Sequence, residues 1–338
     1  MNVKLTKFER MKVSIYRRYM ILTAAIVLSL SAAGQILWRV TSADDAGRAD
    51  TSVRADSVVR TDGVGWTDAL KRPDRGAAPV SYILGTMHTA DVAIADSIAG
   101  FAEAFAGAAA FYGELDSSDI RLSADILAEA AAPEDSTLRR LLTPAQYDSL
   151  TCYIRSLGLD EEGVTAAFDR FKPTMLDLYL TTTRNRENGK SGLMDIVLQR
   201  RAAAQGIRVC ALETARQQMH IIMSMPVSEQ IDALMEVVRN PDKAEEERAA
   251  LTAAYRRHNL AAIERLIQAS ISGEYAERIM YSRNRTWADI LTPVMRRQSL
   301  FVAVGAAHLV GDEGLLALLR RSGFRVTAVD SVQPTADR

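Results

Sequence analysis

Two distant stretches of this sequence share one pattern, in which an apolar run ends at a glycine and a histidine follows shortly after. The first stretch is Pro79–His88, Pro-Val-Ser-Tyr-Ile-Leu-Gly-Thr-Met-His, and the second is Ser299–His308, Ser-Leu-Phe-Val-Ala-Val-Gly-Ala-Ala-His. Short apolar runs of this kind predict buried β-strands. The chain must therefore present two strands that each end in Gly-x-x-His, and we expect the two ends to close on one site.

The glycines of this motif, Gly85 and Gly305, have a physical reading. A residue without Cβ lets the backbone turn sharply or approach a ligand closely. For one copy alone, a tight strand-to-helix turn capped by a histidine also explains the pattern, whereas two copies after two strands favour a functional site. The spacing differs from His-Glu-x-x-His, in which one helix carries both histidines, so the ligands here must come from distant segments.

The remaining apolar runs predict a fold of the α/β (α+β) class. Further strands are expected at Ile36–Val40, Ala108–Tyr112, Ile207–Leu212 and Phe324–Val329. Helices over Asp91–Ala110 and Gly311–Ser322 would complete a strand–helix–strand unit after each motif. Residues from about 120 to 298 are largely helical in pattern. We expect a mixed sheet core built from two related halves, with a large helical insertion lobe between them.

Residues 1–34 predict a signal peptide rather than part of the fold. Basic residues end at Arg17-Arg18, and Met20–Leu30 is an apolar segment of signal-peptide length followed by small residues. An uncleaved membrane anchor is the alternative, although this apolar run is short for a spanning helix. We therefore expect an exported protein, periplasmic or extracellular, that meets a membrane only if the N-terminal segment is retained.

Residues 35–338 are expected to form a single domain with a polar loop insertion over 41–78. Without residues 1–34, 35 basic and 41 acidic residues remain. This balance offers no footprint for a nucleic-acid partner. Cys152 and Cys210 have neither metal-binding nor compact disulfide spacing, so two buried free cysteines are expected rather than a bridge.

Four of the predicted strands end in a polar residue suited to chemistry. These residues are His88, Glu114, Glu213 and His308. Ligands of open α/β sheets gather beyond the carboxyl ends of the strands, so the four side chains are expected to converge. Two imidazoles with one or two carboxylates suit a divalent ion such as manganese, cobalt or zinc. Such an ion would activate water and polarise a carbonyl for hydrolysis, whereas without it a His–Glu pair could act as a general base.

Other polar residues have a functional and a structural interpretation side by side. Arg283 and Asn284 stand at a helix start, where the guanidinium could hold a substrate carboxylate or an oxyanion, or form a salt bridge to Asp116 or Glu213. Glu213 could bind the metal, cap a helix or pair with Arg283. Asp195 follows a glycine and is expected to be an N-cap rather than a ligand. The remaining histidines, His220 and His258, are expected to be packed and at the surface, respectively.

Taken together, these motifs resemble the TraB/GumN family, which includes pheromone-shutdown proteins and the animal Tiki proteins. The resemblance covers most of residues 36–330. It rests on an ordered set of motifs: Leu37-Trp38, Tyr82-Ile-Leu-Gly-Thr-Met-His88, Glu114-Leu-Asp116, Lys172-Pro173, Gly192-Leu-Met-Asp195, Leu212-Glu213-Thr214 with Gln217, Arg283-Asn284 with Trp287, and Val304-Gly-Ala-Ala-His-Leu-Val-Gly311. The polar segment 41–78 departs from the family, where a short hairpin connection is usual.

The resemblance implies a metal-dependent protease activity in which the paired Gly-x-x-His motifs and a glutamate are essential. Carried over to this chain, His88 and His308 would be metal ligands or catalytic bases, and Glu114 a ligand or general base. Two functions follow as hypotheses. The first is an exported, metal-dependent hydrolase, peptidase-like, acting on a peptide or a small molecule. The alternative is a non-catalytic protein that sequesters a peptide or similar ligand in the same cleft.

Overall fold

The computed structural model describes residues 35–43, 78–88, 90–116, 124–187, 194–271 and 273–329. The predicted signal peptide and most of the polar insertion 41–78 lie outside these residues. Within the described part of the chain, no helix is both long and apolar enough to cross a membrane. All described residues belong to one compact unit, 34–338.

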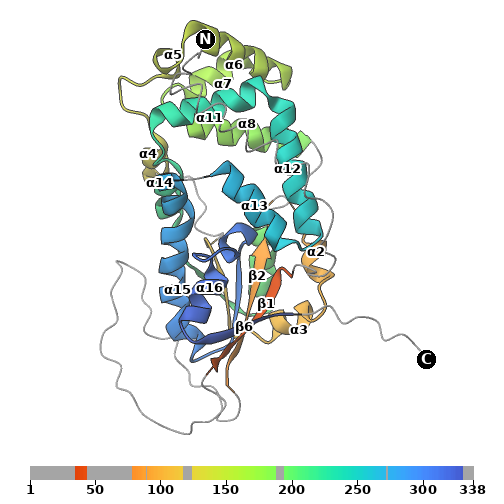
Figure 1. The fold of residues 1–338 in the computed structure, drawn as a ribbon. Coiled ribbons are helices and arrows are strands. Elements are labelled where there is room, and N and C mark those ends of the chain that lie inside the picture. The colour runs from red at the N-terminus through yellow and green to blue at the C-terminus, as the bar shows by residue number, and fades with distance from the viewer. Residues whose placement is uncertain are drawn as a thin grey trace, which may run out of the picture. The chain divides into compact units, whose positions relative to one another are not determined.

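The core is a mixed six-stranded sheet with the order β4-β3-β5-β2-β1-β6. Its strands β1, β2 and β6 are labelled in Figure 1. β2, β5, β3 and β4 run parallel to one another, whereas β1 is antiparallel to both β2 and β6. The strands are β1 (Leu37–Ser42), β2 (Val80–Thr86), β3 (Ala110–Gly113), β4 (Arg208–Ala211), β5 (Leu300–Gly305) and β6 (Phe324–Ala328). The predicted α/β class is confirmed, and the two Gly-x-x-His strands β2 and β5 are direct neighbours.

Helices account for most of the remaining described residues. They are α2 (Ala93–Asp96), α3 (Phe101–Ala106), α4 (Ala124–Ala130), α5 (Leu138–Leu141), α6 (Pro144–Ser156), α7 (Glu161–Phe168), α8 (Pro173–Glu187), α9 (Met194–Ala204), α10 (Ala215–Ile222), α11 (Val227–Arg239), α12 (Pro241–Arg256), α13 (Leu260–Ser270), α14 (Gly273–Ala276), α15 (Ser282–Met295) and α16 (Leu315–Arg321). A π-helical turn, η2 (Glu277–Tyr281), joins α14 to α15, and a 3₁₀ turn, η3 (Ala306–Leu309), follows β5.

The prediction of a single helix over Asp91–Ala110 is wrong. Two short helices, α2 and α3, stand in its place. The break falls at Gly100, whose φ of 76° is left-handed and cannot continue a right-handed helix. Phe101 and Phe105 of α3 pack on Phe301 of β5, with ring centroids 5.6 and 4.9 Å apart. The apolar spacing therefore predicted the buried face correctly but missed the glycine that interrupts the helix.

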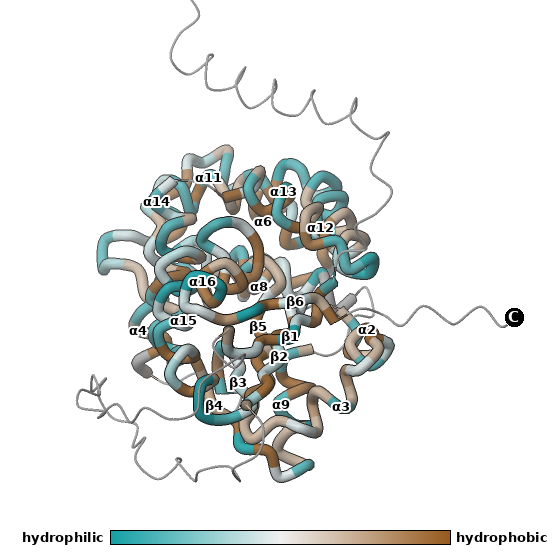
Figure 2. The backbone as a smooth tube through the Cα atoms, turned by 60° about the horizontal axis from the view of Figure 1, so that its bottom comes forward, coloured by the Kyte–Doolittle hydropathy of each residue, from teal (hydrophilic) through white to brown (hydrophobic). Residues whose placement is uncertain are grey.

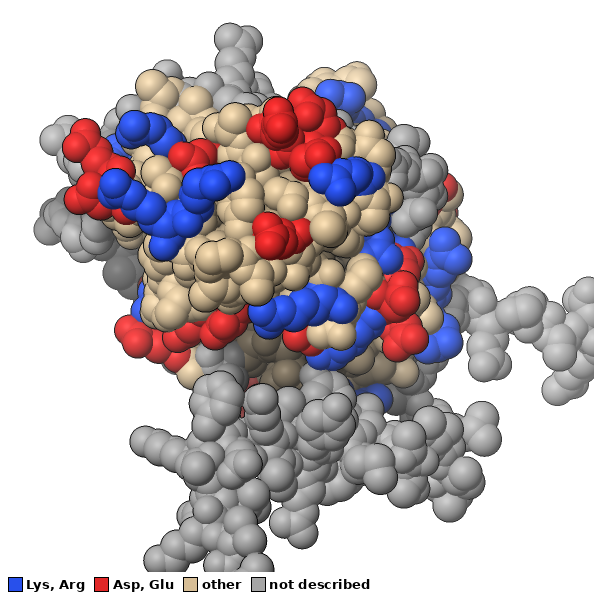
Figure 3. All heavy atoms as spheres, turned by 90° about the horizontal axis from the view of Figure 1, so that it is seen from above, with Lys and Arg blue, Asp and Glu red and all other residues tan. Residues whose placement is uncertain are grey.

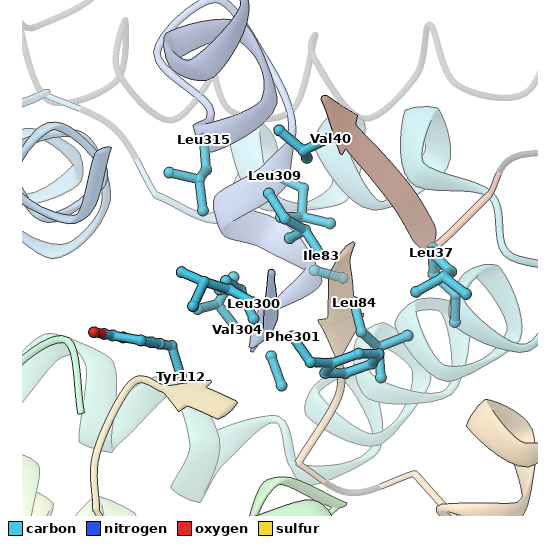
Figure 4. Close-up of a cluster of buried hydrophobic side chains, with 14 of the residues drawn as sticks. Leu37, Val40, Ile83, Leu84, Tyr112, Leu300, Phe301, Val304, Leu309 and Leu315 are labelled. Carbon is cyan, nitrogen blue, oxygen red and sulfur yellow. The ribbon is translucent and has the colours of Figure 1, made fainter. Parts of the chain in front are cut away.

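Two separate hydrophobic cores organise the described residues. The larger core surrounds the sheet, where β5 is buried from Leu300 to Val304. Figure 4 shows Leu309 of η3 close to Ile83 of β2. In Figure 2, which colours the backbone by hydropathy, the central strands are largely hydrophobic. The smaller core is helical and is built by α5 to α8 and α11 around Leu138, Leu150 and Leu176. Only this part of the predicted helical insertion, about 120–298, has a core of its own, because α9, α12, α13 and α15 pack in the larger core.

Both cysteines are free, as predicted, but their burial differs from the prediction. Cys152 is exposed and Cys210 is half-buried. The buried residues of α6 are Leu150, Tyr153 and Ile154, which leaves Cys152 on the solvent side of the helix.

On the face of the molecule seen in Figure 3, basic and acidic side chains are interspersed rather than gathered by sign.

Candidate functional site

The four strands β2, β5, β3 and β4 end at one edge of the sheet. In the pairing of β2 with β5, Thr86 lies opposite Gly305, and β3 pairs through Gly113 with both β5 and β4. Beyond the strands, the backbone N–H of Glu213 donates to the carbonyl oxygen of Glu114 at 3.0 Å. Since parallel strands present their carboxyl ends on the same side, the residues that follow them emerge together. The structure thus brings to one edge the four predicted residues His88, Glu114, Glu213 and His308.

The two motif glycines serve different contacts, and neither has a left-handed backbone. A Cβ on Gly85 would lie 2.8 Å from Leu309 Cδ1 and 3.0 Å from the backbone of Ala306, so this glycine lets η3 pack against β2. A Cβ on Gly305 would lie 3.3 Å from Glu114 Oε1, the atom to which its own N–H donates at 2.8 Å. The sequence predicted a sharp turn or a close approach to a ligand at both positions. The close contacts in the structure are instead to protein atoms, of Leu309 and Ala306 for Gly85 and of Glu114 for Gly305.

Arg283 lies at the centre of the cluster, and its side chain is only 7% exposed. Its Nε donates to Glu213 Oε2 at 3.0 Å, and its Nη2 donates to Glu213 Oε1 at 2.5 Å. Nη2 also donates to Glu114 Oε2 at 2.9 Å. Nη1 donates to the Ile279 carbonyl at 2.8 Å and to His308 Nε2 at 3.1 Å. A guanidinium has five N–H donors, and these five contacts engage them all. Arg283 therefore orients the surrounding groups. Of the two interpretations that the sequence left open for Arg283, substrate binding and a salt bridge, the structure favours the salt bridge, which is made to Glu213.

His308 is buried and held from both sides in one tautomer. Its Nδ1 lies 2.7 Å from Asn284 Oδ1, while the Asn284 amide nitrogen donates to the Glu313 carbonyl at 2.8 Å. Because Arg283 donates to Nε2, the ring must carry its proton on Nδ1 and be neutral. Burial lowers the pKa of His308 to about 4, in keeping with the neutral ring. Trp287 covers the ring at a centroid distance of 4.5 Å.

Glu114 is the carboxylate that reaches both halves of the site. Its Oε1 accepts from the Gly305 N–H, and its Oε2 accepts from Arg283 and from the Gln218 amide at 3.2 Å. Burial raises the pKa of this carboxyl, but the neighbouring His308 and Arg283 together with the Gly305 N–H outweigh burial, so its pKa lies below the ordinary value. Glu114 is thus ionised and its oxygens are fixed in place.

His88 lies at the open side of the site, with its side chain 59% exposed. Its Nδ1 pairs with Asp195 Oδ2, and Asp195 Oδ1 accepts from the Thr86 hydroxyl at 2.5 Å. The hydrogen bond to Asp195 raises the pKa of His88 to about 9, while partial burial opposes the rise. Asp195 occupies the second position of α9 rather than its N-cap, so the N-cap prediction is wrong. Its function in the structure is to fix the His88 ring, with Nε2 left to face a ligand. Because the raised pKa keeps this ring protonated at neutral pH, an ion would have to displace the Nε2 proton.

One pocket of about 320 Å³ connects these groups. Its polar lining includes His88, Glu114, Arg283 and His308, and also Gln218, which sequence reasoning missed. Tyr255 of α12 lines it as well, and its buried hydroxyl donates to the carbonyl oxygen of Gly85 at 2.9 Å. Neither Gln218 nor Tyr255 carries a motif that a single sequence would reveal.

The donor types in this pocket fit a divalent ion, but the four predicted ligands differ in availability. His88 has its Nδ1 bound by a carboxylate, the arrangement typical of a metal-binding histidine, and Glu114 is ionised. The His308 Nε2 and both Glu213 oxygens are engaged by Arg283. Within the described ranges, no three His, Cys, Asp or Glu side chains are grouped as a ready-made metal site. Both Glu114 oxygens also accept hydrogen bonds, but Glu114 lines the pocket and Glu213 does not, so His88 and Glu114 are the residues best placed to hold an ion.

The other two histidines lie apart from the site, and both depart from the prediction. His220 was expected to be packed, but its side chain is 70% exposed and its Nδ1 lies 2.9 Å from Glu129 Oε2. The apolar neighbours Met219 and Ile222 suggested a buried helix, whereas α10 buries none of its residues fully. His258, expected at the surface, is half-buried between α12 and α13 with a left-handed φ of 53°.

Comparison with known proteins places this site in a family context. A sequence model of the TraB/PrgY/gumN family matches residues 70–328. The protein named Metalloprotease TIKI2 from Danio rerio is 22% identical over 311 residues, which cover 76% of this chain and 60% of that protein. The chain thus spans less than two thirds of the length of this curated relative. No solved structure matches.

Proposed function

The chain belongs to the TraB/PrgY/gumN family, and from this premise we propose that it is an exported, metal-dependent hydrolase that cleaves peptide bonds. One observation carries the proposal. His88, Glu114 and His308 come from three strand ends and line one pocket. The distant relative named as a metalloprotease supports the reaction class. Two imidazoles and a carboxylate around one cavity are the groups that hydrolysis at neutral pH requires.

His88 and Glu114 would hold the ion, with manganese, cobalt or zinc as candidates. A bound ion would supply Lewis-acid activation of water and of the substrate carbonyl. Asp195 fixes the His88 ring, and Arg283 with Gly305 fixes the Glu114 carboxylate, so both residues are oriented before any ligand arrives. Buried His308 is neutral and adds a proton acceptor at Nε2 if Arg283 releases it.

A second candidate function is favoured by the engagement of Arg283. Because this guanidinium occupies His308 Nε2 and both Glu213 oxygens, the cluster can be complete without an ion. A protein with this arrangement would capture a peptide in the pocket without cleaving it. The two candidates share the pocket and differ in turnover.

The test is cleavage of an unbiased peptide mixture, with products identified by mass spectrometry. Wild-type protein is assayed after chelation and again with manganese, cobalt or zinc supplied. The hydrolase is expected to cleave only with an ion, and His88→Ala and His308→Ala are each expected to lose turnover while remaining folded. Capture of peptides without products under all of these conditions would instead support the binding protein.

A further inference from the structure

The pocket has a polar wall and an apolar wall that come from different parts of the fold. The strand ends supply the polar wall, as described above. Helices α10, α12 and α13 and the π-helical turn η2 supply the apolar wall. Its residues are Ile222, Leu251, Ile263, Ile267, Ile279 and Met280. Every one of them is an aliphatic or thioether side chain, so this wall offers no hydrogen-bonding side chain to a ligand.

Several residues of the apolar wall are left incompletely covered by the protein. Ile222, Leu251, Ile267 and Ile279 are half-buried although they line a concave surface. Apolar surface in a cavity gains free energy when an apolar group of the ligand covers it. A charged group placed there would lose its hydration, and the one guanidinium in the pocket lining, Arg283, is already neutralised by Glu114 and Glu213. The wall thus favours an apolar occupant.

The apolar wall is tied directly to the reacting groups. The Ile279 carbonyl accepts from Arg283 Nη1 at 2.8 Å, and Arg283 in turn contacts Glu114 and His308. Ile279 and Met280 lie within η2, and π-helical turns of this kind are frequent at functional sites. An apolar group on this wall would therefore lie beside the bond that the polar wall acts on. The pocket volume of about 320 Å³ is at the small end for ligand sites, which suits a single side chain.

We propose that this wall is a specificity subsite that accepts one large aliphatic or aromatic side chain of a peptide substrate, next to the bond that is cleaved. The inference rests on the proposed peptidase function and identifies its substrate class. Ile267 of α13 and Ile279 of η2 are the specificity-determining residues, since both are half-buried and line the pocket from different elements. Peptides with Leu, Met or Phe at that position are preferred, and those with Asp or Lys are rejected.

The experiment uses full-length protein and a set of fluorescence-quenched peptides that differ at one position, with Leu, Met, Phe, Lys or Asp there. Two quantities are measured for each peptide: kcat/KM with metal supplied, and Kd by fluorescence anisotropy with the ion removed. Either kcat/KM or the binding affinity is expected to be about tenfold or more higher for the Leu peptide than for the Asp peptide. Ile267→Ala is expected to reduce this preference, and Ile267→Glu to shift it toward Lys.

Ile290→Ala provides the matched control. Ile290 is a half-buried isoleucine of α15 that packs on the main core and does not line the pocket. The control should lose a similar amount of stability and keep the preference. Turnover without any apolar preference, or a preference that Ile267→Glu leaves unchanged in a folded protein, overturns the subsite but not the hydrolase. Apolar preference in Kd without turnover upholds the subsite and contradicts the hydrolase, and neither binding nor turnover contradicts both.

Discussion

The backbone N–H of Gly305 donates to Glu114 Oε1 at 2.8 Å. This contact links the second Gly-x-x-His motif to the carboxylate that follows β3, and it leaves little room for a Cβ. The glycine of the first motif has no such contact, because its missing Cβ makes room for Leu309 and Ala306. The glycine of the second motif, Gly305, therefore contributes to the site, whereas the glycine of the first motif, Gly85, contributes to packing.

Exchanging each glycine for alanine separates these two functions. Gly305→Ala is expected to displace the Glu114 carboxylate, which Arg283 and Gln218 hold from the other side, and to lower hydrolysis at least about tenfold with little loss of stability. Gly85→Ala is expected to lower the free energy of unfolding by about 1–3 kcal/mol through overpacking. Hydrolysis rates and urea unfolding of both variants are measured together. Equal losses of activity and stability in both would contradict the assignment.

Arg283 is predicted to be the residue whose loss costs the site most stability. Arg283→Met leaves two buried carboxylates without their cationic partner and should destabilise the protein by roughly 3–5 kcal/mol. Arg283→Lys should recover little, because an ammonium cannot reproduce the forked contacts to Glu213. Urea unfolding measures both variants.

The control for this prediction is Arg201→Met. Arg201 pairs with Asp96, whose side chain is 44% exposed, and an exposed pair contributes at most about 1 kcal/mol. If Arg283→Met lowers the free energy of unfolding no more than Arg201→Met does, the cluster is not organised around Arg283.

Much of the fold follows from the apolar pattern, because buried strands and helices have characteristic spacing. The strand ends at Glu114 and Glu213 were identified because polar residues interrupt apolar runs there, and β6 lies close to its predicted bounds. Gly100 broke a predicted helix because its left-handed φ depends on the packing of α3 against the sheet. His220 was misjudged because hydrophobic neighbours in a sequence do not reveal which helix face is covered.

The site was only partly predictable for a different reason. Asp195 and His88 are far apart in sequence and meet because α9 packs on the sheet beside β3 and β4, so an acid near a helix start looks like a cap. The five contacts of Arg283 could not be inferred, since they depend on the positions of Glu114, Glu213, Ile279 and His308 together. The apolar wall comes from helices of the insertion and carries no motif of its own.

Asp195 is predicted to act through His88 rather than on the substrate. Asp195→Asn removes the carboxylate that fixes the imidazole and should weaken binding of manganese, cobalt or zinc about 10- to 100-fold. Isothermal titration with each ion measures the affinity directly, and circular dichroism checks the fold. Asp96→Asn is the control, as Asp96 pairs with Arg201 at the surface. Unchanged affinity in Asp195→Asn would show that His88 does not hold the ion.

Asp177 of α8 gives a pH-dependent prediction outside the site. Burial raises the pKa of this carboxyl above its ordinary value of 3.8. The folded chain therefore binds this proton more tightly than the unfolded chain, so the contribution of Asp177 to stability is most favourable below pH 3.8 and is lost as pH rises through the folded pKa. Asp177→Asn removes the cost of the buried charge.

The variant is expected to have a higher urea midpoint than wild type at pH 7, with the difference shrinking as the pH falls toward 3.8. Urea unfolding at a series of pH values checks this. A difference that stays constant with pH, or a less stable variant at pH 7, would show that Asp177 bears no desolvation cost.

The account depends most on Glu114, the carboxylate that contacts Arg283, Gln218 and Gly305 while lining the pocket. The direct measurement is the rate of peptide hydrolysis by wild type, Glu114→Gln and the control Glu129→Gln, with metal supplied. Glu129 is a half-buried glutamate that does not line the pocket. We predict that Glu114→Gln lowers the rate about 100-fold or more in a folded protein, while Glu129→Gln stays within about twofold of wild type. A Glu114→Gln protein that hydrolyses peptides at the wild-type rate would contradict the account.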